Sequence, residues 1–166
     1  MTTQSVENPA AIAFGSVTPV LRVSNVRASI EYYTGALGFE VVFLFPNAEQ
    51  ANFASVSRGD CGLFLSEGDQ GHPGAWVWID GVDVDAVYEE YKASGAKIRN
   101  PPTNYSWARE IQVEDLDGNV LRIGSDRKKN EPNGEWLDMH GVRWSPRPEN
   151  YGARADVKTD IEGTKR

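Results

Sequence analysis

The sequence is poor in the features that mark secreted and membrane proteins. Its 166 residues include a single cysteine, Cys61, so no disulfide can form within the chain. No apolar run approaches the roughly 20 residues that a membrane-spanning helix needs. Residues 1–14 lack both the basic start and the apolar run of a signal peptide. We therefore expect a cytoplasmic protein with no membrane partner.

Basic residues are also scarce over most of the chain. The 17 Lys and Arg stand against 24 Asp and Glu, which gives a net charge of −7. Residues 1–126 hold 8 basic and 17 acidic side chains, whereas residues 127–166 hold 9 and 7. Because an acidic body repels phosphates and attracts cations, we expect no nucleic-acid partner and favour a cationic ligand. The alternative is that the acidity serves solubility alone.

The stretch "AWVWI", residues 75–79, is the most informative part of the sequence. Side chains alternate along a strand, so Trp76 and Trp78 share one face while Val77 and Ile79 take the other. A sheet that already buries Val and Ile on one face gains little stability from burying two Trp side chains as well, because both indole N–H groups would need hydrogen-bond partners. This pattern favours an aromatic wall of a ligand cleft. The alternative is that both rings pack under a neighbouring element.

The remaining patterns predict the same order of elements twice. The first set is a strand over 18–23, a helix capped by Ser24 or Asn25 and ended by Gly38, and strands over 39–45, 52–56 and 62–66. The second set is a strand over 75–79, a helix from Asp83 to Gly95, and strands over 97–100, 109–113 and 120–123. A duplicated βαβββ unit explains this order, and chance similarity is the alternative.

Three regions follow from this division. Residues 1–15 are an N-terminal arm, residues 16–126 form one domain of two βαβββ repeats (about 16–68 and 74–126), and residues 127–166 are a C-terminal extension. Neither repeat can bury a sheet face alone, so the two must pair. The predicted fold class is α+β, with two βαβββ modules forming an open, cup-shaped, eight-stranded mixed sheet whose hollow is a natural ligand site.

Four segments carry a family resemblance: "VTPVLRVSNVRASIEYYTGALGFEVVF", "ANFASVSRGDCGLFLSEGDQG", "GAWVWIDGVDVDAVYEEY" and "NYSWAREIQVEDLDGNVLRIGS". Together they cover most of residues 17–125 and resemble the glyoxalase/bleomycin-resistance/extradiol-dioxygenase superfamily, also called vicinal oxygen chelate proteins. The order of "PVL", "AWVW" and "W-x-RE" before "D-x-x-GN" is most similar to the bleomycin resistance proteins.

The resemblance also says where the enzymes of this superfamily bind a divalent metal. By alignment, three of the ligand positions are Thr18, Gly74 and Arg122, none of which is a good metal ligand. The two histidines offer no replacement, because His72 lies between Gly71 and Pro73 in a predicted loop and His140 lies in the extension. We therefore expect no metal, no cofactor and no catalysis.

What the resemblance implies instead is a homodimer that sequesters a planar, cationic drug of the bleomycin type in clefts at the dimer interface, and so confers antibiotic resistance. By alignment the cleft residues are Phe43, Phe53, Ser66, Trp76, Trp78 and Trp107. Arg109 and Glu110 would add hydrogen bonds in the cleft, or else form a solvent-facing ion pair worth little. Phe43 and Phe53 have core packing as an equal alternative.

Several points depart from the family or remain open. The bleomycin binders carry an acidic residue where this chain has Val41 and Val42. The extension is longer than the family domain requires, and its "EWLDMHGVRW" is too apolar for a disordered linker. Pro19 matches a strand that the family exchanges between subunits, although a proline at a sheet edge also has a local explanation.

Two other functions are the alternatives to drug sequestration. One is a divergent lyase, isomerase or dioxygenase of the same superfamily, and the other is a small-molecule sensor whose extension binds a protein.

Overall fold

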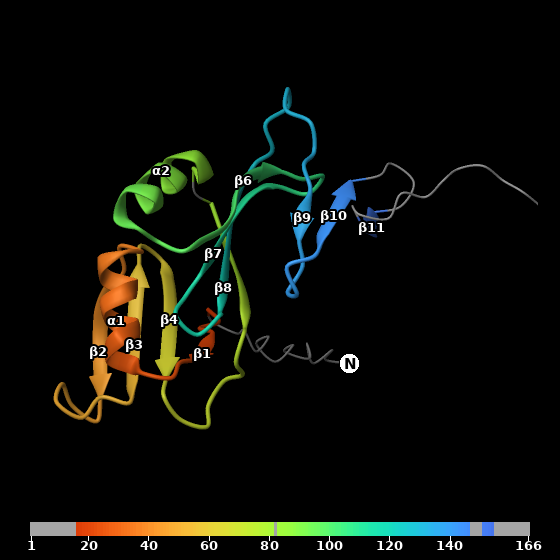
Figure 1. Cartoon of the computed structure of the whole chain (residues 1–166). Coiled ribbons are helices and arrows are strands. Elements are labelled where there is room, and N and C mark those ends of the chain that lie inside the picture. Colours follow the sequence, from red (N-terminus) through yellow and green to blue (C-terminus); the bar gives the residue numbers. More distant parts are fainter. Residues whose placement is uncertain (1–15, 82, 147–150, 155–166) are drawn as a thin grey trace, which may run out of the picture.

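The computed structural model describes residues 16–81, 83–146 and 151–154 (Figure 1). The first module contains β1 (Val20–Arg22), α1 (Val26–Gly35), β2 (Glu40–Phe45), β3 (Phe53–Arg58) and β4 (Cys61–Ser66). The second contains β5 (Trp76–Asp80), α2 (Val84–Ser94), β6 (Ile98–Asn104), β7 (Arg109–Glu114) and β8 (Val120–Ser125). Three short strands follow: β9 (Trp136–Leu137), β10 (Arg143–Pro146) and β11 (Tyr151–Arg154).

Both modules have the same strand order. The first sheet is β1-β4-β3-β2 and the second is β5-β8-β7-β6. In each sheet the first pair is parallel and the other pairs are antiparallel. The predicted α+β fold class is confirmed, with the eight strands of the two modules arranged as two four-stranded mixed sheets. The division into arm, domain and extension stays a prediction.

The helix ends follow from local chemistry. The Asn25 side chain accepts a hydrogen bond from Ala28 N and so begins α1, and Asp83 caps α2 in the same way. Gly95 ends α2 with φ of 78°, as predicted. Gly38 does not end α1, because the helix already closes at Ala36 and Gly38 instead turns the chain into β2.

One hydrophobic core serves both modules. It includes Leu63 and Leu65 of β4 together with Ile111 of β7 and Leu121 of β8, and Val77 and Ile79 of β5 pack against it. Two tyrosines also join the modules through their hydroxyls. Tyr33 donates to Asp115 Oδ2 at 3.1 Å, and Tyr91 donates to the Leu37 carbonyl at 3.2 Å. Burial raises the pKa of Tyr91 to about 12, so its hydroxyl keeps its proton at neutral pH.

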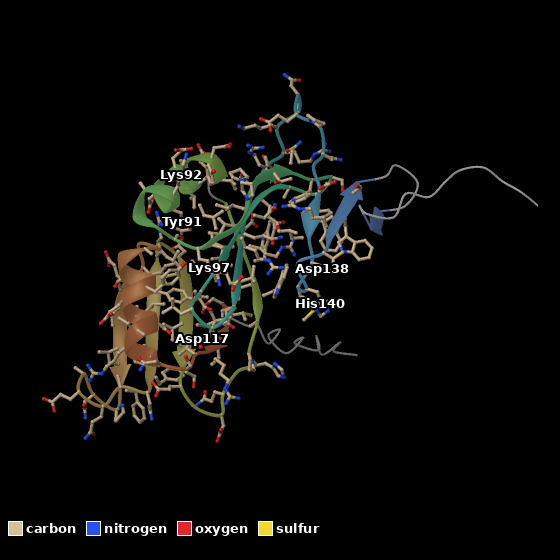
Figure 2. All side chains as sticks on the ribbon, in the orientation of Figure 1. Tyr91, Lys92, Lys97, Asp117, Asp138 and His140 are labelled. Atoms are coloured by element: carbon tan, nitrogen blue, oxygen red, sulfur yellow. The ribbon has the colours of Figure 1, made fainter. Side chains whose placement is uncertain are left out.

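The last strands lie on the far side of the second sheet. In Figure 1, β7 and β8 run between the two helices and the β9–β10 pair. Figure 2 likewise places Asp138 and His140 across these strands from Tyr91 and Lys92 of α2. β9 contacts β6, and Asp138 O accepts a hydrogen bond from Arg99 of β6. This part of the extension therefore packs along the body of the same chain.

β6 is longer than predicted. It runs from Ile98 to Asn104 through Pro101 and Pro102, whereas the sequence predicted a strand ending at residue 100. Proline is tolerated here because β6 is the edge strand of its sheet, and the pairing with β7 shifts register on both sides of Asn100.

Neither α1 nor α2 has the length and apolar character needed to span a bilayer.

Candidate functional site

The two tryptophans of β5 lie on the sheet face that points away from the core, as the alternation predicted. Trp78 is 41% exposed, whereas Val77 and Ile79 pack against the core. The Trp78 ring lies against β8, where Gly124 provides room for it: a Cβ added there would stand 2.2 Å from ring atom Cη2. The alternative that both rings pack under a neighbouring element therefore does not hold for Trp78.

An arginine guanidinium lies over the ring of each of these two tryptophans. The Arg99 guanidinium lies 5.3 Å from the Trp76 ring centroid, and that of Arg122 lies 5.2 Å from the Trp78 ring. Both are within the range of cation–π attraction. The face is therefore a layer of alternating aromatic and cationic groups, and it is not simply apolar.

The Glu110 carboxylate fixes the Arg122 guanidinium through an ion pair. Arg122 donates from Nε to Oε1 at 2.8 Å and from Nη2 to Oε2 at 2.7 Å, in a bidentate ion pair. Glu110 is 1% exposed, and its oxygens also accept from Gln112 Nε2 at 3.2 Å and from Trp107 Nε1 at 3.2 Å. The hydrogen bond with Glu110 raises the pKa of Arg122 further, although burial opposes it. Arg122 is a permanent cation in this face.

Trp107 forms the other wall of a cavity of about 520 Å³. The cavity is lined by Trp78, Trp107 and the charged side chains of Asp80, Asp83, Asp85, Arg109, Asp126 and Lys128, among others. Trp107 is 46% exposed and stacks on Tyr105, with ring centroids 4.9 Å apart and planes 13° apart. Two indoles and several carboxylates thus share one open pocket.

Phe43, Phe53 and Ser66 lie together on the first sheet. They line a second cavity, of about 460 Å³. Phe43 stacks on Phe53 at 6.1 Å, and Phe64 packs against both rings. None of the three phenylalanines belongs to the hydrophobic core, and Phe43 is 46% exposed. The structure therefore places these rings outside the core, with Phe43 exposed and Phe53 and Phe64 partly buried.

The predicted ligand residues thus fall into two groups. Trp78, Trp107 and Arg109 line one cavity, with Glu110 hydrogen-bonded to Trp107, while Phe43, Phe53 and Ser66 line another. Trp76 lies on the same face as Trp78 but under Arg99. The alternative that Arg109 and Glu110 form a solvent-facing ion pair is wrong, because both side chains are buried and each pairs with a different partner.

Sequence reasoning missed three residues of this region. Gly124 makes room for Trp78, Arg99 covers Trp76, and Asp85 accepts two hydrogen bonds from Arg109, at 2.9 and 2.6 Å. Gly124 carried one signal: it lies two residues after Arg122, so it shares a strand face with it.

The residues at the family's metal positions do not fit a metal ion. Arg122 is ion-paired with Glu110, Gly74 offers no side chain and has φ of 72°, and Thr18 supplies only a hydroxyl. Within the described parts of the chain, no three His, Cys, Asp or Glu side chains come together as a metal site would need. His72 and His140 are both exposed.

Cys61 does not resemble an activated nucleophile. Burial raises the pKa of its thiol, which reduces the thiolate fraction at neutral pH. Such a thiol is a weak nucleophile unless a base or a cation activates it.

Comparison with known families agrees with this geometry. The model of the Glyoxalase/Bleomycin resistance protein/Dioxygenase superfamily matches residues 14–123. The chain belongs to this superfamily. The superfamily contains both enzymes and binding proteins, so membership by itself leaves the activity open. No curated protein matches the chain in sequence.

Solved structures share the fold, and they include two drug-binding proteins as well as TioX. The bleomycin-binding protein from bleomycin-producing Streptomyces verticillus, complexed with copper(II)-bleomycin, is 27% identical with a TM-score of 0.58, over 70% of this chain and 100% of that one. TnmS3, an antibiotic binding protein from Streptomyces sp. CB03234, is 23% identical with a TM-score of 0.59, over 70% and 99%. TioX from Micromonospora sp. ML1 is 21% identical with a TM-score of 0.58, over 67% and 98%.

Proposed function

We propose that this chain is a metal-independent binding protein that sequesters a planar, cationic antibiotic of the bleomycin type and thereby confers resistance. One observation carries the proposal: Arg122, at a position where the family's enzymes carry a metal ligand, is locked to the buried Glu110 beside two partly exposed indoles. A guanidinium at this point repels a divalent ion, and the adjoining rings offer stacking surfaces.

The charges of the larger cavity support a cationic ligand. Asp80, Asp83 and Asp126 contribute carboxylates to its lining. The two cations of the lining, Arg109 and Lys128, are already paired with Asp85 and Glu131. A planar group could stack on Trp78 or Trp107, at roughly 0.5–2 kcal/mol per contact, while a cationic end group lies near the carboxylates.

We further infer that the working unit is a homodimer. The aromatic group of the first sheet and that of the second line separate cavities in one chain. A two-fold dimer in which each Phe43 surface faces the partner's Trp107 surface would combine them into two equal clefts. The resemblance to the bleomycin resistance proteins, which bind drugs at such an interface, supports this arrangement.

Titration with copper-bound and with metal-free bleomycin tests the proposal. We expect quenching of tryptophan fluorescence and a rise in melting temperature that grows with ligand concentration, because a ligand that binds only the folded state stabilises it. Trp107→Ala should raise the dissociation constant about 2-fold to 30-fold, which corresponds to the loss of one stacking contact. Leu116→Ala is the matched control, because Leu116 is a 57% exposed apolar side chain just beyond the opposite end of β7.

The outcome that contradicts the proposal is equally specific. If neither form of bleomycin, nor a panel of planar cationic antibiotics, alters the fluorescence or melting temperature of the unmodified chain, sequestration of this drug class is wrong. A stoichiometric transition metal in protein purified without chelator would favour the enzymatic alternative.

A further inference from the structure

The loop that carries Trp107 is fastened to the C-terminal extension at the residue that precedes it, Asn104 at the end of β6. Asn104 is 3% exposed, and its side chain donates to the carbonyls of Lys128 and Glu131 at 3.1 and 2.9 Å. Its Oδ1 accepts from Lys128 N at 3.0 Å, and its own carbonyl accepts from Gly134 N at 2.8 Å. A buried amide bonded at both ends fixes the extension against the end of β6.

The other end of the loop is fastened by ion pairs. Arg109 is 7% exposed and donates to Asp85 of α2 and, at 2.6 Å, to Glu131 of the extension. Lys128 also reaches Asp85, at 2.8 Å, and Glu131, at 3.4 Å. Two cations and two carboxylates thus join α2, β7 and the extension in one closed network, which is stronger than an isolated surface pair.

A third link reaches the Trp107 ring itself. The ring stacks on Tyr105, whose hydroxyl donates to the Glu135 carbonyl at 3.3 Å and accepts from Asn100 Nδ2 at 2.9 Å. The extension therefore holds the ring on which Trp107 rests. Its residue Lys128 also lines the cavity beside Trp107.

We propose that residues 128–135 of the extension position Trp107, so that the extension is a working part of the ligand site. This inference rests on the proposed function. Loops are usually mobile unless they are held by tertiary contacts. A wall that is ordered before binding spares the ligand the loss of side-chain freedom, so loosening Trp107 should weaken binding about threefold to tenfold.

The first test needs no ligand. Glu131→Gln removes the charge paired with Arg109, and Tyr105→Phe removes the hydroxyl that reaches Glu135 while keeping the ring under Trp107. Acrylamide quenching is measured with and without an added Trp107→Phe change, and the difference isolates the emission of Trp107. We expect both variants to make Trp107 more accessible to acrylamide than in the unmodified chain.

Glu90→Gln is the matched control. Glu90 pairs with Arg58 at 2.7 Å, and Glu131 pairs with Arg109 at 2.6 Å. The two glutamate side chains are similarly exposed, 48% for Glu90 and 44% for Glu131. The control therefore removes a similar ion pair away from Trp107. If Glu131→Gln and Tyr105→Phe leave Trp107 quenching at the unmodified value, or if Glu90→Gln changes it equally, the positioning role is wrong.

The second test uses copper(II)-bleomycin. Glu131→Gln should raise the dissociation constant about threefold to tenfold, and Glu90→Gln should not. If the unmodified chain does not bind, the proposed function fails, while the quenching experiment still decides whether the extension orders Trp107. If Glu131→Gln loosens Trp107 but leaves the dissociation constant unchanged, the extension is not a working part of the site.

Discussion

Trp78 of β5 occupies the space above Gly124 of β8, and a Cβ on Gly124 would lie 2.2 Å from the ring. The two strands are parallel neighbours, with Trp78 in register with Arg122 and Asp80 in register with Gly124. The ring therefore leans across the adjacent strand to the next residue on that face. The position of the Trp78 indole therefore depends on residue 124 being a glycine, which has no side chain.

Gly124→Ala should displace Trp78. The collision cannot be relieved without moving the ring or the strands, so we expect a loss of about 1–3 kcal/mol in the free energy of unfolding, with a shift in tryptophan emission. Gly62→Ala on β4 is the control, since an added Cβ there meets no atom within 4 Å. Denaturant unfolding measures both, and equal effects in the two variants would contradict the packing argument.

Removing one partner of the Arg122–Glu110 ion pair should lower the free energy of unfolding more than removing both partners. Arg122→Met leaves the buried Glu110 carboxylate without its main counter-charge, which should lower the free energy of unfolding by about 3 kcal/mol. The double variant Arg122→Met with Glu110→Met removes both charges and should recover part of that loss. Denaturant unfolding of the two single variants and the double variant measures this. A double variant that loses the full sum would show that the two residues act independently.

Chelators should have no effect on ligand binding. Because Arg122 holds the place of a metal ligand, treatment with a strong chelator should change neither the melting temperature nor the affinity for metal-free bleomycin. Isothermal titration before and after treatment checks this. A loss of binding that added zinc, manganese or iron restores would show that the face takes a metal after all.

Acid should weaken the network around Asp85. Arg109 donates to this carboxylate and lowers its pKa from 3.8 to about 2; Lys128 acts in the same direction and burial opposes it. A lowered pKa stabilises the folded state fully above 3.8, and that contribution is lost as the pH falls to about 2. Asp85→Asn should therefore melt at a lower temperature at neutral pH and lose less on acidification. Parallel melting curves against pH would contradict this.

Mixing two weakened variants tests the dimer. Phe53→Ala and Trp107→Ala each damage one of the two aromatic groups, so every cleft of either homodimer should bind less tightly than in the unmodified protein. If each cleft takes one group from each chain, random exchange of subunits should leave about one quarter of the clefts intact. Titration of the mixture should recover that fraction of binding sites with the affinity of the unmodified protein. No recovery, after exchange has been verified, would indicate that each site lies within one chain.

The sequence predicted the features that depend on near neighbours. The facing of Trp76 and Trp78 follows from strand alternation, and the ends of α2 follow from Asp83 and Gly95. The pairing of Arg109 with Glu131 could not be predicted in this way, because it depends on how the extension returns to the sheet. The same holds for Gly124, whose role appears only when β5 lies beside β8.

The family resemblance gave a set of expected site residues, and the structure divides them between two cavities within one chain. Phe43 and Trp107 appear equivalent in an alignment, yet they line different cavities. The prolines of β6 misled for a similar reason: they favour a strand ending at residue 100 unless the strand is known to lie at the sheet edge. Both points concern relations between segments that are far apart in sequence, and only the end of β6 was predicted wrongly.

The cation at the centre of the binding face is a side chain of the protein. A guanidinium cannot be lost to competing scavengers, exchanged for a different element or altered by oxidation of an ion, and its charge persists at every physiological pH. Under the proposed function, a chain built in this way would require no metal delivery after it folds. As a resistance protein of the proposed kind, it would protect a cell that is starved of trace elements as well as one that is well supplied.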